Sequence, residues 1–201
     1  MREYVGCKVE RRDRDNLIIF QDDLVNKIEK IFGEKVKNMH EYGMPAGSRE
    51  HIKRPDEGEP ILERSEQTVY RRGVGLLLYL VKFSRLDISN AVREFSKVMD
   101  EATVGNMKSM LRTIKYVLDT KNRVLSYDTR EQEGRKWILK SFSDSDWAGS
   151  KDDRRSITGY LHIFEWMLGI MEIKRTEACD SIINRSRVCS SVRNVYRHHV
   201  H

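Results

Sequence analysis

The stretch from Ser141 to Tyr160 constrains the fold of this chain more than any other. An apolar run that begins at Trp137 leads into two carboxylates, Asp144 and Asp146, and a second apolar run begins at Ile157. This order indicates the end of one strand, an acidic bend and a second strand. An acidic residue at a strand exit is also a position at which a hydrolase would hold a divalent metal.

Composition narrows the class of protein. The chain has 201 residues, of which 39% are hydrophobic, so it can form one domain with a core or two small ones. Charged residues make up 34%, and the net charge is +6. A polyanionic partner such as nucleic acid is compatible with this charge, and an ordinary basic soluble protein is the alternative.

Several classes of protein are not expected. The three cysteines, Cys7, Cys179 and Cys189, match no zinc-binding spacing and suggest no disulfide framework. No apolar run reaches the roughly 18 residues of a membrane span, and the N-terminus lacks the apolar region of a signal peptide. We therefore expect an intracellular protein without a membrane anchor.

The first third of the chain predicts a hairpin, a helix and a linker. Tyr4–Val9 and Leu17–Phe20 have the character of two strands. A helix with Asp22 as its cap and Gly33 as its stop is expected next. All three prolines then fall within Tyr42–Pro60, which we interpret as the best domain boundary in the chain.

Apolar periodicity predicts three further helices. They cover Val69–Phe83, a segment from an Asp87 cap to Met99, and about Asn106–Leu118. Gly73 and Gly75 are interpreted as helix-packing positions in the first of these. Strands are expected after the helices, and no regular pattern is seen from residue 165 onward; the expected strands are Val124–Tyr127, Lys136–Phe142 and the run from Ile157 to Ile163.

A set of cations on and after the third of these helices is a candidate for contact with phosphate. A helical stripe of this kind is commonly a solvated face, so that alternative stays open. The candidate residues are Lys108, Arg112, Lys115, Lys121 and Arg123.

Two pairs of segments resemble the Pol polyprotein of copia-type LTR retrotransposons. Tyr70–Leu80, followed by Ser84–Ile88 and Ala91-Val92, resembles that family's Y-R-x-x-V-G-x-L-x-Y-L…T-R-P-D-I-x-x-A-V. Ser143–Gly149 with Asp153–Tyr160 is similar to its S-D-A-D-W-A-G…D-R-K-S-T-S-G-Y. The order and spacing of the blocks agree as well.

The resemblance covers roughly residues 3 to 163 and implies an α+β fold. The implied fold is the end of a reverse-transcriptase palm and thumb-connection region, a hairpin plus helices, followed by an incomplete RNase H-like mixed sheet. The implied segments are 1–60 (palm end, thumb start and linker), 61–125 (helical thumb and connection), 126–164 (N-terminal part of RNase H) and 165–201 (an out-of-frame, poorly ordered tail).

The resemblance also implies a site and a partner. Asp144 matches the first catalytic carboxylate of RNase H, a ligand of Mg²⁺, while Asp146 and Asp153 are interpreted as turn or capping residues. Two-metal hydrolysis needs a cluster of carboxylates, and the family's polymerase motif Y-x-D-D is not in these 201 residues. We expect an inactive Pol remnant, with two alternatives: an RNase H completed by carboxylates supplied elsewhere, or a non-enzymatic piece that binds an RNA–DNA hybrid or duplex.

A frameshift near Phe164 would explain where the resemblance ends. Residues 170–189 admit codons whose next reading frame gives S-W-K-S-K…S-S-T-E-A-E-Y, the form of the family's next strand and helix. Arg187 then stands where that helix carries its catalytic glutamate, and a cation would repel Mg²⁺. Two smaller departures from the family pattern are Leu86 and Arg72, a charge beside a buried helix. Sequencing the locus tests the hypothesis, which is wrong if the next frame lacks S-S-x-E-A-E-Y.

Overall fold

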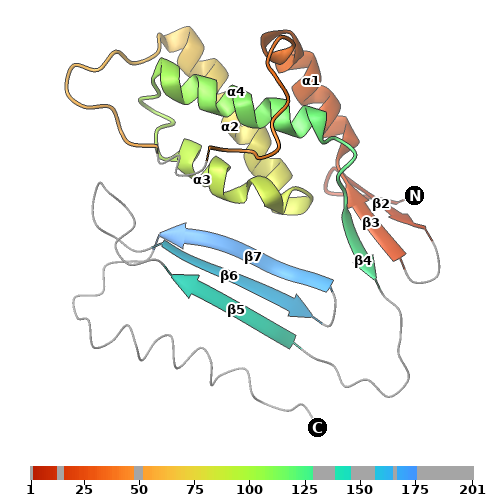
Figure 1. Cartoon of the computed structure of the whole chain (residues 1–201). Coiled ribbons are helices and arrows are strands. Elements are labelled where there is room, and N and C mark those ends of the chain that lie inside the picture. Colours follow the sequence, from red (N-terminus) through yellow and green to blue (C-terminus); the bar gives the residue numbers. More distant parts are fainter. Residues whose placement is uncertain are drawn as a thin grey trace, which may run out of the picture. The chain divides into compact units, whose positions relative to one another are not determined.

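The chain is α+β, as expected, and it forms two compact units. The computed structural model describes residues 2–12, 16–47, 52–128, 139–145, 157–164 and 167–175. The first unit covers Met1–Arg130 and the second Glu131–His201 (Figure 1).

The first unit contains an antiparallel sheet of strand order β1-β2-β3-β4. The predicted hairpin is confirmed by the pairing of β2 (Cys7–Arg11) with β3 (Asn16–Phe20). The strand predicted over 4–9 is broken, because the chain turns between β1 (Arg2–Tyr4) and β2. Val5 and Gly6 form this turn with positive φ angles of 51° and 65°.

The last strand of this sheet comes from the far end of the unit. β4 (Leu125–Asp128) pairs with β3, in a register that sets Leu125 opposite Ile19, and Figure 1 shows the two strands side by side. The unit therefore extends past the boundary predicted at residue 125, because the backbone of β4 finds its partner in β3.

Helix α1 (Asp22–Val36) corrects two predictions. Gly33 does not stop the helix, since the buried stripe of Val25, Ile28 and Phe32 continues to Val36 one turn later. The N-cap position belongs to Gln21, which makes no side-chain capping bond, so Asp22 is not the cap. Asp22 lies in the first turn, where a carboxylate interacts favourably with the helix dipole.

The other predicted helices are confirmed with shifted bounds. They are α2 (Arg64–Phe83), α3 (Ser89–Ser96) and α4 (Val104–Asp119), and a 3₁₀ turn, η1 (Leu86–Ile88), precedes α3. Asp87 does not cap α3, because it lies within η1 and binds Arg85. Thr103 caps α4 by accepting a hydrogen bond from the Asn106 backbone N–H at 3.3 Å.

One apolar core joins the helices of the first unit. It includes residues of α1, α2, α3 and α4 together with Ile52 from the predicted linker and Leu62, which follows it. The linker is also hydrogen-bonded to the helices: the Ile52 N–H donates to Glu94 at 3.1 Å, and the Thr113 hydroxyl donates to the Pro45 carbonyl at 2.7 Å. The described residues of the segment, 42–47 and 52–60, therefore pack on the unit and do not divide it.

The second unit contains a sheet of order β5-β6-β7, built from β5 (Leu139–Ser145), β6 (Ile157–Phe164) and β7 (Met167–Arg175). The two predicted strands are confirmed by the pairing of β5 with β6. The first was predicted to end at Phe142, but β5 continues to Ser145, so Asp144 lies within the strand and not in a bend after it. All pairings among the described strands of this unit are antiparallel, whereas a mixed sheet was expected.

Strand β7 lies in the segment predicted to be a poorly ordered tail. For residues 167–175 that prediction is wrong, because they pair with β6 from Phe164 opposite Met167 to Ile157 opposite Arg175. Pairing satisfies the backbone N–H and C=O groups, and the two isoleucines of the segment favour strands. Residues 176–201 lie outside the described residues.

The two glycines of α2 form a matched pair for a stability test. A Cβ on Gly73 would lie 2.5 Å from Met110 Sδ and 3.2 Å from Phe32 Cζ, while a Cβ on Gly75 would meet nothing within 4 Å. The packing interpretation is thus confirmed for Gly73 and wrong for Gly75. We expect Gly73→Ala to lower the free energy of unfolding by about 1–2 kcal/mol, since Met110 and Phe32 are fully buried.

The control is Gly75→Ala, which should raise the free energy of unfolding by about 0.5–1 kcal/mol through helix propensity. Urea denaturation of the two variants measures both values. Equal effects of the two substitutions would contradict the assigned packing of α2.

Candidate nucleic-acid interface

The predicted phosphate contacts on α4 differ in how exposed and how occupied they are. Lys108 is exposed to solvent. The guanidinium of Arg112 lies over the ring of Tyr42, 4.6 Å from its centroid. Lys115 forms an ion pair with Asp119 at 2.6 Å, and only 16% of its side chain is exposed. Two of these three cations are therefore engaged within the unit.

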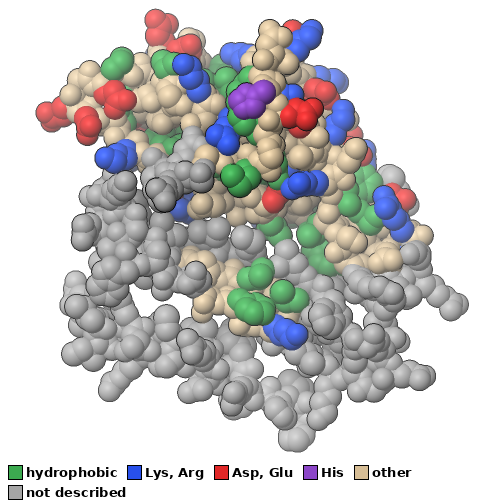
Figure 2. All heavy atoms as spheres, viewed as in Figure 1, with side chains coloured by type: hydrophobic (Ala, Val, Ile, Leu, Met, Phe, Trp, Pro, Cys, Tyr) green, Lys and Arg blue, Asp and Glu red, His purple; other side chains and the backbone are tan. Residues whose placement is uncertain are grey.

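The two cations that follow α4 also have partners. Lys121 Nζ lies 4.0 Å from a carboxylate oxygen of Glu29 on α1. Arg123 donates to the Tyr116 hydroxyl at 2.7 Å and lies 3.9 Å from Asp87. Figure 2 shows basic and acidic side chains interspersed over the face that carries α1 and the end of α4. This face has a mixed charge, although the sequence suggested a basic one.

A polar cluster holds η1 against the end of α4. Arg85, which is 3% exposed, donates to both carboxylate oxygens of Asp87 at 2.9 Å. The Arg85 guanidinium also donates to the hydroxyl oxygen and to the backbone carbonyl oxygen of Thr120. The Tyr116 hydroxyl donates to Asp87 at 2.9 Å and accepts from Arg123. The cluster fixes the place where the chain leaves α4 for β4.

The charge of Asp87 is stabilised by this cluster. Burial by itself would raise the pKa of Asp87, but the hydrogen bonds and the charge of Arg85, together with the bond from Tyr116, outweigh it and hold the pKa below its ordinary value. For Tyr116 the same contacts act in the other direction: burial and then the hydrogen bond to Asp87 raise the pKa of the phenol. The cluster therefore contains a carboxylate and a neutral phenol at neutral pH.

The exposed face of α2 is a second basic surface, and the sequence analysis did not select it. Arg72, Gly75, Tyr79 and Lys82 follow one another at helical spacing, and all four are exposed. Tyr79 is anchored at one end, because its hydroxyl donates to the Val5 carbonyl at 2.7 Å. The side chain of Arg72 therefore points to solvent, although the sequence analysis placed it beside a buried helix.

The signal for this surface was present in the spacing of α2. The buried positions Tyr70, Val74 and Leu77 define one face of the helix, and the glycine at position 75 falls on the opposite face. Four cations and a single acid, Glu66, are found between the bounds of α2. The acid lies in the first turn, so the rest of the helix carries positive charge only.

The structure places the predicted metal ligand only by its backbone. Asp144 lies in β5 opposite Gly159 of β6, and its side chain is outside the described part of the chain, as are Asp146 and Asp153 entirely. Within the ranges that the structure describes, no group of three or more His, Cys, Asp or Glu residues could hold a metal ion. The binding of Mg²⁺ at Asp144 stays a prediction. No helix among the described residues is both long and apolar enough to cross a membrane.

Comparison with known proteins finds relatives among transposon polyproteins. The chain is 37% identical over 97 residues to the retrovirus-related Pol polyprotein from transposon RE1 of Arabidopsis thaliana, a match that covers 48% of this chain and 6% of that protein. It is 25% identical over 168 residues to the corresponding polyprotein from transposon TNT 1-94 of Nicotiana tabacum, covering 81% of this chain and 12% of that protein.

A shorter relative is matched over most of its length. The uncharacterized mitochondrial protein AtMg00240 of Arabidopsis thaliana is 32% identical over 95 residues, which cover 47% of this chain and 81% of that protein. No family model and no solved structure matches the chain. The chain spans only a small part of the Pol polyproteins to which it is similar.

The Asp87 cluster predicts a pH dependence of stability. Because the folded-state pKa of Asp87 lies below its unfolded value, the carboxylate stabilises the fold above about pH 4, and this contribution is lost as the pH falls toward the folded pKa. Asp87→Asn should lower the free energy of unfolding at pH 7 by about 1–2 kcal/mol, since it leaves the buried Arg85 without a carboxylate. The free energy of unfolding of Asp87→Asn should therefore fall less between pH 7 and pH 3 than that of the unmodified chain, because the variant has no carboxylate to protonate at this position.

The control for this prediction is Asp23→Asn. Asp23 forms an ion pair with Lys8, and the side chain of Asp23 is 71% exposed. The substitution should change the free energy of unfolding by less than about 0.5 kcal/mol. Denaturant titrations of the three proteins between pH 3 and pH 7 make the comparison. A parallel pH profile for Asp87→Asn and the unmodified chain would contradict the assigned role of the carboxylate.

Proposed function

Since the chain belongs to the retrovirus-related Pol polyproteins of transposons, we propose that these 201 residues are a copia-type Pol segment that binds nucleic acid and has no catalysis of its own. The segments named above as palm end, thumb-connection region and start of RNase H are part of this proposal. The partner is an RNA–DNA hybrid or a duplex, and the net charge of +6 favours such a polyanion.

The observation that carries nucleic-acid binding is the exposed Gly75 on the basic face of α2. A glycine in the middle of a helix costs about 1 kcal/mol relative to alanine, and nothing within 4 Å of a Cβ at this position explains it. A missing side chain allows another molecule to approach the helix backbone closely. Gly75 therefore suits a surface that presses against a partner.

The residues around Gly75 fit a phosphate-lined partner. Arg72 and Lys82 lie one turn before and two turns after it on the same face, and each can donate charge-assisted hydrogen bonds to phosphate oxygens. Tyr79, a residue that is 37% exposed, adds an aromatic ring to this face. We propose this face as the principal interface in preference to α4, where Lys115 is already neutralised by Asp119.

An RNase H-type hydrolysis is the alternative function. It is favoured by the Ser143–Gly149 motif and by the antiparallel pairing of β5 with β6. In this alternative Asp144 and carboxylates supplied elsewhere would hold two Mg²⁺ ions, which activate water and stabilise the leaving oxygen.

We expect no metal-dependent cleavage of an RNA–DNA hybrid by the 201-residue chain, because one carboxylate cannot hold two metal ions. Incubation of the labelled hybrid with Mg²⁺ or Mn²⁺ measures this. Cleavage that disappears in Asp144→Asn would support the alternative and overturn the inactive assignment.

The α2 face predicts how variants change binding to a hybrid or duplex. Arg72→Gln and Lys82→Gln should each weaken affinity at 50–100 mM salt by roughly three- to tenfold and reduce the slope of log K against log salt by about 1. Gly75→Gln should weaken binding by about tenfold or more, because its side chain blocks the close approach, while its free energy of unfolding should not fall.

Lys30→Gln is the matched control, since it removes one charge from an exposed position of α1. It should change the affinity much less than Lys82→Gln does. Fluorescence anisotropy at several salt concentrations gives all four values. If Gly75→Gln binds with the affinity of the unmodified chain, the partner does not approach the α2 backbone closely at this position.

A further inference from the structure

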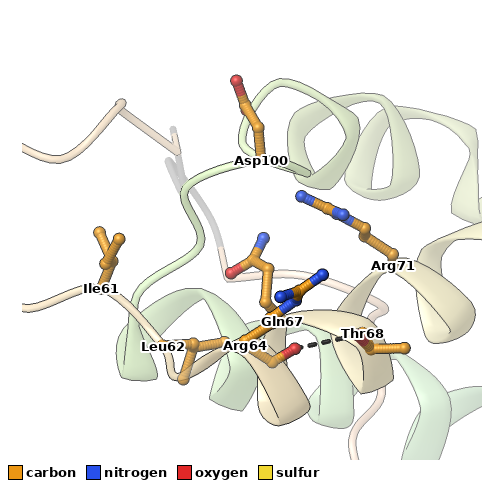
Figure 3. A pocket seen from close by; sticks show the side chains of 7 residues that line it. All are labelled: Ile61, Leu62, Arg64, Gln67, Thr68, Arg71 and Asp100. Atoms are coloured by element: carbon orange, nitrogen blue, oxygen red, sulfur yellow. Dashed lines mark hydrogen bonds between the residues drawn. The ribbon is translucent and has the colours of Figure 1, made fainter.

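A pocket lies beside the N-terminal end of α2. Its volume is about 410 Å³, and its walls come from residues 61–62, from the first two turns of α2 and from Asp100 in the connection between α3 and α4 (Figure 3). A volume of this size falls within the roughly 300–1,000 Å³ of small-molecule sites. The pocket is therefore larger than a bare inorganic ion requires.

The available hydrogen-bond donors of the pocket are guanidinium groups. Gln67 uses both ends of its amide, donating to the Met99 carbonyl at 2.6 Å and accepting from the Ala102 N–H at 3.2 Å. The Thr68 hydroxyl donates to the Arg64 carbonyl at 2.9 Å. The Thr68 hydroxyl and one N–H of the Gln67 amide are thus committed to the fold, and the two guanidinium groups are the charged donors left to bind a ligand.

Two arginines of the pocket have charges that the described residues do not neutralise. Figure 3 shows the side chains of Arg64 and Arg71 extending from α2 on the side of the pocket. Arg71 is oriented by a bond from its Nε to the Met99 carbonyl at 2.8 Å, which leaves both Nη groups for a ligand. Among the described residues neither arginine forms an ion pair, while Asp100 lies 3.8 Å from Arg54.

We propose that this pocket binds a phosphate group, carried either by a free nucleotide or by a nucleic-acid strand. A guanidinium is a planar, permanently charged donor of paired hydrogen bonds to phosphate oxygens, and two of them line this pocket. Ile61, which is 54% exposed, and Leu62 form an apolar wall that can contact the sugar or base. For a strand, the inference rests on the function proposed above; for a free nucleotide it stands apart from it.

The test uses the full 201-residue chain and five probes: inorganic phosphate, a 5′-mononucleotide, the matching nucleoside, and a short single strand in two forms, with and without a 5′-phosphate. We expect the mononucleotide to bind and the nucleoside not to bind. Arg64→Gln should weaken mononucleotide binding at least about fivefold. Arg64→Lys, which keeps the charge and loses the planar fork, should weaken it less.

Lys30→Gln is the control, because it removes an exposed cation of α1 that lies outside both the pocket and the α2 face. It should leave mononucleotide affinity unchanged. Calorimetric titration measures the affinities, and circular dichroism checks that each variant is folded. A preference for the 5′-phosphorylated strand over the mononucleotide would identify a strand as the source of the phosphate, and the reverse order a free nucleotide.

Two results would overturn the inference. One is mononucleotide affinity that does not depend on Arg64; the other is an equal loss in Arg64→Gln and Lys30→Gln, which would mean that only net charge matters. If the unmodified chain binds the mononucleotide through Arg64 but does not bind duplex, the pocket is supported and the proposed α2 interface is wrong. Retention of duplex binding without any phosphate selectivity in the pocket counts against this inference only. The two proposals can therefore fail separately.

Discussion

The first unit depends on the close contact of α2 with Met110 and Phe32 at Gly73. A Cβ at this position would lie 2.5 Å from the Met110 sulfur and 3.2 Å from Phe32 Cζ, so any larger residue requires these two side chains to move. The contact fixes which face of α2 is buried. Gly75, two residues further along, is thereby turned to solvent, and the basic residues that share its face are turned outward with it.

The helices could be predicted from the sequence because their apolar periodicity is local. The assignment of Asp87 as a cap failed for a reason that is not local. Its carboxylate is held by Arg85 and by Tyr116, which lies in α4, 29 residues away. A residue that suits a helix cap also suits a buried ion pair, and only the fold decides between the two.

The positions of the cations were easier to predict from the sequence than the partners with which they form ion pairs. The sequence identified the cations on and after α4. Lys115 meets Asp119 through helical spacing, and Lys121 meets Glu29 because α1 packs near α4. The strand at 167–175 was missed because its segment follows the point at which the family pattern ends. Its pairing with β6 is made by backbone groups, which every residue other than proline can supply. A resemblance to a family pattern does not detect such pairing.

The pairing of β3 with β4 has a consequence for how the first unit is made. Strands β1 to β3 leave the ribosome early, but the open side of β3 finds its partner only when residues 125–128 have been synthesised. Until then β3 offers an unpaired edge to other chains. Helices α2 and α3 are close in sequence and can pack early, whereas α1 packs chiefly on α4, which is synthesised just before β4. The closure of the unit is therefore a late event, and the nascent chain is exposed to aggregation until then.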